Sequence, residues 1–152
     1  MRPVQILLAE DSVGDVVLVR KALESMNVPT QLTVVDDGEQ LLHYLVDALK
    51  LEDPESALPF PDVVLIDLNM PKLDGFKAME LISEQGGCQH LPLVVISSTS
   101  NPEDRRLAKH LGAYGFIDKA LGPMELVEQL QFIERLWAAP HTLEHSASRR
   151  RH

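Results

Sequence analysis

Short apolar runs rich in branched side chains recur along the chain, and each run predicts a β-strand. A run without polar interruption is typical of a strand that is buried on both faces of a parallel sheet. The central run, Val63 to Ile66, leads straight into Asp67, and the rest of the chain is arranged around it. The five predicted strands cover Val4–Ala9, Leu32–Val35, Asp62–Ile66, Leu93–Ile96 and Tyr114–Asp118.

Apolar residues at helical spacing lie between and after these runs, and polar residues mark where helices begin. The first such segment keeps only a rough helical period, over Val13, Val16, Val17, Leu23 and Met26. Two later helical segments are Leu73–Gln85 and Pro123–Trp137. Capping signals predict three helix starts, at Ser12 with Asp15, at Asp37 with Gln40, and at Asn101 before Pro102.

The strand–helix alternation, repeated five times, predicts an α/β fold: one five-stranded parallel sheet, doubly wound, with helices on both faces. The length of 152 residues predicts a single domain, which we expect to span residues 1–140. Residues 141–152 contain three consecutive arginines and few apolar side chains, so we expect a disordered tail. That segment is also too short to fold as a DNA-binding domain.

Composition and charge narrow the range of partners. A net charge of −9 argues against binding to nucleic acid or to an anionic membrane surface, both of which need a basic face. No apolar run approaches membrane-spanning length, and the N-terminus lacks a signal pattern. The single cysteine, Cys88, fits a reducing compartment, so we expect a cytoplasmic protein.

Reactive polar side chains follow four of the five predicted strands. They are Glu10 and Asp11 after the first, Asp67 after the third, Ser97 after the fourth and Lys119 after the fifth. The carboxyl ends of parallel strands meet at one edge of the sheet, which is where ligands bind in such folds. We therefore expect these five side chains to converge on one crevice.

Three carboxylates in one crevice repel each other and require a positive charge. A hard divalent cation such as Mg²⁺ takes carboxylate and carbonyl oxygens as ligands and leaves room for a phosphate group. Lys119 and Ser97 are suited to binding the oxygens of a phosphoryl group. Asp67 is then the candidate nucleophile, because aspartate forms covalent phosphoryl intermediates.

In this order and spacing the motifs resemble the receiver domains of two-component response regulators over residues 4 to about 138. The matched pieces are Glu10-Asp11, Asp67 with Asn69-Met70-Pro71, Asp74-Gly75, Ser97 and Lys119. The resemblance implies a flavodoxin-like sheet with strand order 2-1-3-4-5. It also implies a signalling protein that accepts phosphate, without an enzymatic activity beyond phosphotransfer and self-dephosphorylation.

The resemblance implies a role for each matched residue. Asp67 is the expected phosphoacceptor. The expected Mg²⁺ ligands are Glu10 through a water molecule, Asp11, Asp67 and the backbone carbonyl of Asn69. Ser97 and Lys119 are expected to bind the phosphoryl oxygens, and Ser97 and Phe116 to act as the switch that reports them.

Further features are similar to the small single-domain regulators that partner bacterial phytochromes. They include a long loop before the third strand, the segment Ser98–Asp104 and the ending Glu134–Trp137. The expected partner is therefore a sensor histidine kinase of the bacteriophytochrome type. One departure from the wider family is Ala120, which stands where a proline usually follows the lysine; a cis bond before alanine costs ~3 kcal/mol, so we expect trans.

Two other functions fit parts of the pattern. A Mg²⁺-dependent phosphatase of the haloacid dehalogenase type also uses a strand-end aspartate, but it needs a second aspartate two residues on, after the first strand. This chain has adjacent Glu10 and Asp11 there. A degenerate receiver that only binds partners is the other alternative, and the complete set of site residues argues against it.

The last predicted helix suggests a homodimer. Its period places Leu126, Leu130, Ile133 and Trp137 in one stripe that should face the sheet. Phe132 and Leu136 are four residues apart and share a different face. Two neighbouring exposed apolar residues are typical of an interface, so we expect two copies to pair through this helix.

Overall fold

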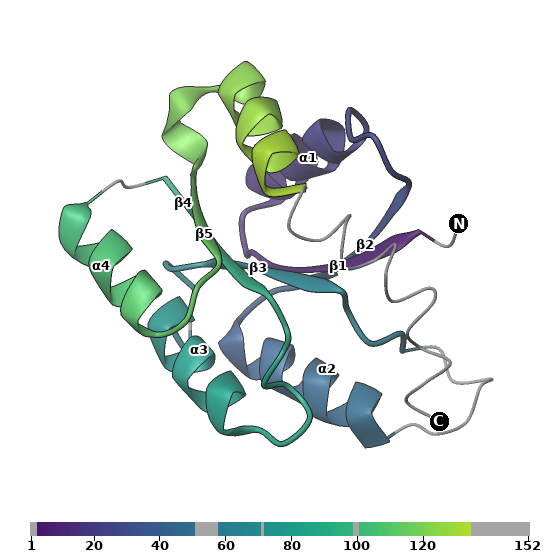
Figure 1. Cartoon of the computed structure of the whole chain (residues 1–152), viewed down its shortest axis with the longest axis vertical. Helices are drawn as coiled ribbons and strands as arrows, with labels where there is room; N and C mark the ends of the chain where they lie inside the picture. Colours follow the sequence, from purple (N-terminus) through teal and green to yellow (C-terminus); the bar gives the residue numbers. More distant parts are fainter. Residues whose placement is uncertain (1–2, 51–57, 71, 99–100, 135–152) are drawn as a thin grey trace.

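Five parallel strands form one sheet in the order β2-β1-β3-β4-β5 (Figure 1), as the resemblance implied. The computed structural model describes residues 3–50, 58–70, 72–98 and 101–134. The strands are β1 (Val4–Ala9), β2 (Thr30–Val35), β3 (Val63–Asp67), β4 (Leu93–Ser97) and β5 (Gly115–Asp118). β2 begins two residues earlier than predicted, because Thr30 pairs with Val4 at the start of β1 and extends the ladder.

Helices cover both faces of the sheet. They are α1 (Val13–Leu23), α2 (Gly38–Lys50), α3 (Gly75–Glu84), α4 (Pro102–His110), the 3₁₀ turn η1 (Lys119–Leu121) and a last helix over residues 123–134. Figure 1 shows α1 and the last helix on one face and α2, α3 and α4 on the other. The doubly wound architecture predicted from the alternation is therefore confirmed, and no helix among the described residues is long and apolar enough to cross a membrane.

Two hydrophobic cores lie on the two faces, and alternate strand residues enter different cores. Leu7 packs with the residues of α2 and α3, whereas its neighbour Leu8 packs with α1 and the last helix. Both leucines are buried, which is why the strands read as continuous apolar runs. The predicted stripe Leu126, Leu130 and Ile133 is buried in the second core, while Trp137 lies outside the described residues.

All three predicted helix caps are present. Their side-chain oxygens accept backbone N–H bonds: Ser12 from Asp15 at 3.2 Å, Asp37 from Gln40 at 2.8 Å, and Asn101 from Glu103 at 2.8 Å. The third helix starts at Gly75 rather than at the predicted Leu73, because Asp74 caps it.

The apolar stripe expected on the first helix is wrong at two positions. Val13 is 79% exposed and Val17 is 47% exposed. Val19, Ala22 and Leu23 supply the buried residues of α1 instead. Valines occur on both the exposed and the buried side of α1, so spacing alone did not reveal which ones face the sheet.

Glu134 fixes the last helix to the turn between α1 and β2. Its carboxylate is buried and accepts bonds from the backbone N–H of Asn27 at 2.8 Å and of Val28 at 3.3 Å, and from the Asn27 side-chain amide at 2.8 Å. A buried charge is tolerated when it is fully hydrogen-bonded in this way. The residues beyond it, including the predicted tail over 141–152, lie outside the described part of the chain.

Gly38 provides a test of this packing. A Cβ at Gly38 would lie 2.3 Å from the backbone oxygen of Leu73. We expect Gly38→Ala to lower the free energy of unfolding by about 2 kcal/mol, because neither backbone segment can move without shifting α2 from the loop that follows β3. Urea denaturation would measure it.

Gly86→Ala is the matched control, because a Cβ there meets nothing within 4 Å. That variant should be as stable as the wild type or more stable by less than about 1 kcal/mol. Equal effects of the two substitutions would contradict the close approach at Gly38.

Candidate functional site

Three carboxylates converge at the carboxyl edge of the sheet. Asp67 is the last residue of β3, and Glu10 and Asp11 directly follow β1. Because β1 and β3 are neighbours, with Ala9 opposite Ile66, the three side chains meet. Each offers one oxygen, and these oxygens lie within 4.8 Å of one another, with Glu10 and Asp67 buried and Asp11 exposed.

Lys119 lies at the centre of this cluster. It begins η1 directly after β5, and its side chain is buried. The ammonium Nζ lies 2.5 Å from Glu10 Oε1, 2.7 Å from Asp15 Oδ2 and 3.2 Å from Asp67 Oδ2. An ammonium group has three protons, so these three carboxylates use all of its donors.

The pKa of Lys119 shows which effect prevails at the ammonium. Burial by itself lowers this pKa, but the hydrogen bonds that the ammonium donates to Asp15 and Glu10 and the charge of Asp67 outweigh it. The result is a pKa above the ordinary value, so the ammonium stays charged although it is buried.

The pKa of Glu10 is raised first by burial and then by its acidic neighbour. Burial and the adjacent Asp67 raise it from 4.5 to about 7, against the lowering effect of Lys119. One ammonium faces four carboxylates here, namely Glu10, Asp11, Asp15 and Asp67, so the cluster favours a further cation.

The loop after β3 shapes the Asp67 end of the site. The backbone N–H of Asn69 donates to Asp67 Oδ1 at 2.9 Å, so both carboxylate oxygens of Asp67 have partners. The N–H of Gly75 donates to the carbonyl of Leu68 at 3.3 Å. A Cβ at Gly75 would lie 2.7 Å from the Asp67 carbonyl oxygen, so glycine is required where α3 begins beside the strand.

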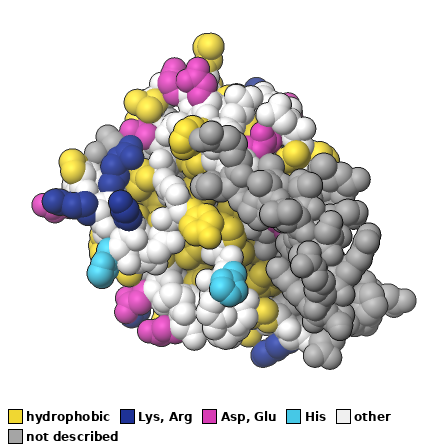
Figure 2. Space-filling model, in the orientation of Figure 1, with side chains coloured by type: hydrophobic (Ala, Val, Ile, Leu, Met, Phe, Trp, Pro, Cys, Tyr) yellow, Lys and Arg dark blue, Asp and Glu magenta, His cyan; other side chains and the backbone are white. Residues whose placement is uncertain are grey.

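Ser97 and Phe116 lie on the two strands at the β5 edge. Ser97 ends β4, is fully buried and pairs with Asp118 in the strand register. Phe116 on β5 is partly buried, and the Arg105 guanidinium of α4 lies 4.5 Å from the centre of its ring, within cation–π distance. Figure 2 shows the Lys and Arg side chains gathered at the left, over the position of α4.

The backbone around Lys119 has the trans geometry that the sequence predicted. The described residues contain no cis peptide bond, in agreement with the trans bond expected before Ala120. The Asp118 carboxylate accepts from the Ala120 N–H at 2.9 Å. The Gln129 amide bonds both the N–H and the carbonyl of Asp118, each at 2.9 Å. These bonds fix the direction in which the chain leaves β5, and therefore the position of Lys119.

One site residue was not identified from the sequence. Asp15 was read as part of a helix cap, and its N–H does bond Ser12, but its carboxylate contacts Lys119 instead of returning to the helix end. In a capping box the acid bonds the N–H of the capping residue. Here the Ser12 N–H donates to Glu10 Oε2 at 3.2 Å, which leaves Asp15 available. In the sequence, the only indication that Asp15 belongs to the site was its position one helical turn after Asp11.

The cluster of Glu10, Asp11 and Asp67 fits a hard divalent cation. All ligands are oxygens, their spacing allows one ion to reach them, and their excess negative charge favours it. The carbonyl of Asn69 remains a predicted ligand.

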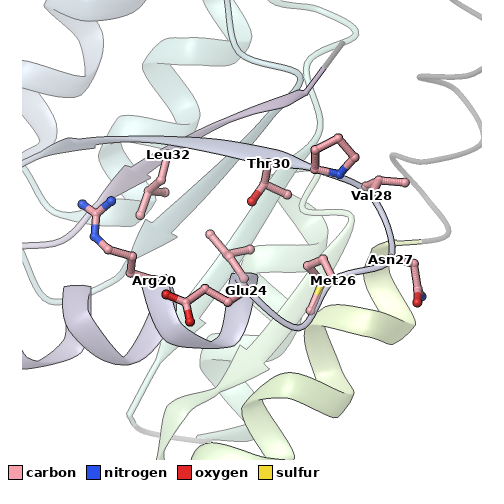
Figure 3. Close-up of a pocket in the computed structure, with 9 residues that line it drawn as sticks. Arg20, Glu24, Met26, Asn27, Val28, Thr30 and Leu32 are labelled. Carbon is pink, nitrogen blue, oxygen red and sulfur yellow. The ribbon is translucent and has the colours of Figure 1, made fainter. Parts of the chain in front are cut away.

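A separate surface pocket lies between α1 and β2 (Figure 3). Arg20, Glu24 and Leu32 are among its lining residues. It also includes Thr30, the first residue of β2, so it opens toward the amino ends of the strands, away from the cluster.

Comparison with known proteins decides the family. The family description of the response regulator receiver domain matches residues 6–131. The chain belongs to this family. The family was expected from five residues, which are Glu10, Asp11, Asp67, Ser97 and Lys119. In the structure of this receiver domain each of them lies at the end of a strand or directly after it.

This receiver domain is similar to other response regulators, and one of the similar solved structures is described as a phytochrome response regulator. Response regulator Rcp1 of Synechocystis sp. is 29% identical over 141 residues, which is 93% of each chain. The phosphorylated cyanobacterial phytochrome response regulator RcpA is 29% identical with a TM-score of 0.77, over 91% of this chain and 96% of that one. The Mn²⁺-bound form of Rcp1 is 28% identical with a TM-score of 0.73, over 89% and 94%.

The two acids after β1 should contribute unequally to metal binding. Asp11 is exposed at the cluster, whereas Glu10 is buried and already bonded to Lys119 and to the Ser12 N–H. We expect Asp11→Asn to weaken Mg²⁺ binding by more than roughly tenfold and Glu10→Gln to weaken it less. Calorimetric titration of Mg²⁺ would rank the two variants, and an equal or reversed ranking would contradict this arrangement.

Proposed function

We propose that this receiver domain takes a phosphoryl group from the phosphohistidine of a sensor histidine kinase onto Asp67, in a Mg²⁺-dependent reaction, and signals through protein contacts. One observation carries the proposal: Asp67 lies both in the three-carboxylate cluster and within 3.2 Å of the Lys119 ammonium. A carboxylate that adjoins a cation site and a fixed ammonium is placed to become an acyl phosphate.

In the proposed step an Asp67 carboxylate oxygen attacks the phosphorus of the phosphohistidine. The new O–P bond forms as the P–N bond breaks, and the imidazole leaves with the electron pair and takes up a proton. Mg²⁺, held by Glu10, Asp11, Asp67 and the Asn69 carbonyl, would neutralise charge on the transferred oxygens when bound. Lys119 and Ser97 would bind those oxygens from the protein side.

The switch would use the strand ends next to the acceptor. Ser97 ends β4, the strand that pairs with β3 and its terminal Asp67, and Phe116 lies on the neighbouring strand beside Arg105 of α4. A shift of Ser97 would allow Phe116 to move and so change the α4 surface. The buried core under these residues supports the proposal, because packed cores change between discrete arrangements.

The partner we propose is a histidine kinase of the bacteriophytochrome type. The similarity to the cyanobacterial phytochrome regulator RcpA, over 91% of this chain, supports this choice. We further propose that residues 1–140 form the receiver domain and that it acts in the cytoplasm, where the buried free thiol of Cys88 would stay reduced. The phosphatase alternative has no support from the site, since the two acids that follow β1, Glu10 and Asp11, are adjacent, whereas that enzyme needs two aspartates separated by one residue.

Replacement of the acceptor tests the proposal. Wild-type protein with acetyl phosphate and Mg²⁺ should gain the mass of one phosphoryl group, and Asp67→Asn should gain none, because an amide oxygen is not a nucleophile here. Intact-mass spectrometry would measure both. Chelation of Mg²⁺ should abolish the mass gain in the wild type.

The matched control is Asp36→Asn. Asp36 directly follows β2 but lies outside the three-carboxylate cluster, so this variant should be phosphorylated like the wild type. A phosphorylated Asp67→Asn protein would disprove the assignment.

We also propose that the receiver forms a homodimer through the last helix. Phe132 is 66% exposed, although its neighbour Ile133 is buried, and this exposed aromatic side chain supports an interface. Leu136, its expected companion, lies outside the described residues.

Phe132→Glu combined with Leu136→Glu should give a folded monomer that is still phosphorylated, because neither residue belongs to the cluster. Light scattering coupled to gel filtration would report the mass, with Phe60→Glu as an exposed apolar control outside the last helix. A wild-type monomer at high micromolar concentration, with and without a phosphate mimic, would rule out the dimer.

A further inference from the structure

One partner of Lys119 stands outside the cluster that fits a metal. Among the described residues, the cluster that could hold a metal ion consists of Glu10, Asp11 and Asp67. Asp15 is not a member, yet its carboxylate lies 2.7 Å from the Lys119 ammonium. The contact joins the first turn of α1 to the residue that begins η1, 104 positions later in the chain.

A phosphoryl group on Asp67 would need hydrogen-bond donors, and the ammonium of Lys119 already uses all of its own. Its three protons are all donated, to Glu10, Asp15 and Asp67. Phosphorylation of Asp67 frees only the proton that Lys119 donates to Asp67 itself, so Lys119 can bind a further phosphoryl oxygen only if Glu10 or Asp15 is released. Phosphorylation also replaces the single charge of the Asp67 carboxylate by the larger charge of a phosphoryl group, in a site that still holds Glu10, Asp11 and Asp15.

Asp15 is the partner that can leave at the lowest cost. Its side chain is 36% exposed, whereas those of Glu10 and Asp67 are almost fully buried. A carboxylate near water recovers its hydration when an ion pair breaks, and a buried one does not. At the N-terminal turn of α1 it also keeps a favourable interaction with the helix dipole after it leaves Lys119.

We propose that Asp15 is a positioning residue that competes with the phosphoryl group for Lys119 and so limits how tightly the receiver holds phosphate. The inference rests on the proposed function of Asp67. In the unphosphorylated protein Asp15 holds the ammonium beside the acceptor. In the phosphorylated protein it is displaced toward solvent by the phosphoryl oxygens.

Two ligands should respond to Asp15 in opposite directions. Asp15→Asn keeps the size of the side chain and removes its charge. Beryllofluoride, which mimics the phosphoryl group on an aspartate, should then bind roughly tenfold more tightly, because an anionic competitor for Lys119 is gone. Mg²⁺ alone should bind more weakly, because the site has lost a negative charge. A variant that merely loosened the fold would weaken both.

The experiment is a beryllium titration of the full chain at fixed excess fluoride and saturating Mg²⁺, followed by the ¹⁹F signal of the bound mimic. Asp15→Asn should tighten the midpoint, and Asp15→Ala should shift it in the same direction as a second variant. Asp15→Glu, which keeps the charge, should stay near the wild type. Glu39→Gln, which removes an exposed first-turn acid of α2, is the control and should leave the midpoint unchanged.

The outcomes separate this inference from the proposed function. If wild-type protein binds beryllofluoride but Asp15→Asn binds it equally or more weakly, Asp15 does not compete for Lys119 and the inference is wrong by itself. If wild-type protein does not bind beryllofluoride and gains no mass from acetyl phosphate, the phosphoacceptor function fails and the inference fails with it.

Discussion

The buried ammonium of Lys119 holds the site together. It contacts carboxylates that follow β1, end β3 and lie on α1, while Lys119 itself follows β5. Removing an ammonium from water is costly, and only close acceptors for all its protons offset that cost. Two sets of hydrogen bonds help Lys119 to reach these acceptors: those between Gln129 and Asp118, and the bond from the Ala120 N–H to Asp118. They fix the backbone position from which the Lys119 side chain extends.

The same contacts make the site sensitive to charge. The pKa of Glu10 is about 7, and one lysine lies among four carboxylates. A change of one charge therefore alters which groups Lys119 can bind. A cation among the carboxylates and an anion on Asp67 act on the same ammonium from opposite directions. In the function we propose, a signal would begin as an exchange of partners at Lys119, and Ser97 and Phe116, which lie on adjacent strands, are the proposed route toward α4.

The fold and most of the site could be predicted because they depend on local patterns. A strand buried on both faces must be apolar throughout, so β3 and β4 were visible as runs, and their ends located Asp67 and Ser97. Parallel strands bring their carboxyl ends to one edge, which placed Glu10 and Lys119 beside Asp67 before any coordinates were known. The caps at Ser12, Asp37 and Asn101 were equally local, since each depends on residues two or three positions apart.

The tertiary structure alone decided which polar groups meet across long separations. Asp15 has the sequence of a helix-cap residue, and only the position of Lys119 turns it into a site residue. Glu134 ends a helix in the sequence, yet it is a buried anchor for Asn27. The exposure of Val13 could not be predicted either, because the sequence does not distinguish an exposed valine at the start of α1 from a valine in the core. Sequence records the hydrophobic period and the local hydrogen bonds, whereas the pairing of charges depends on distances that exist only after the sheet has formed.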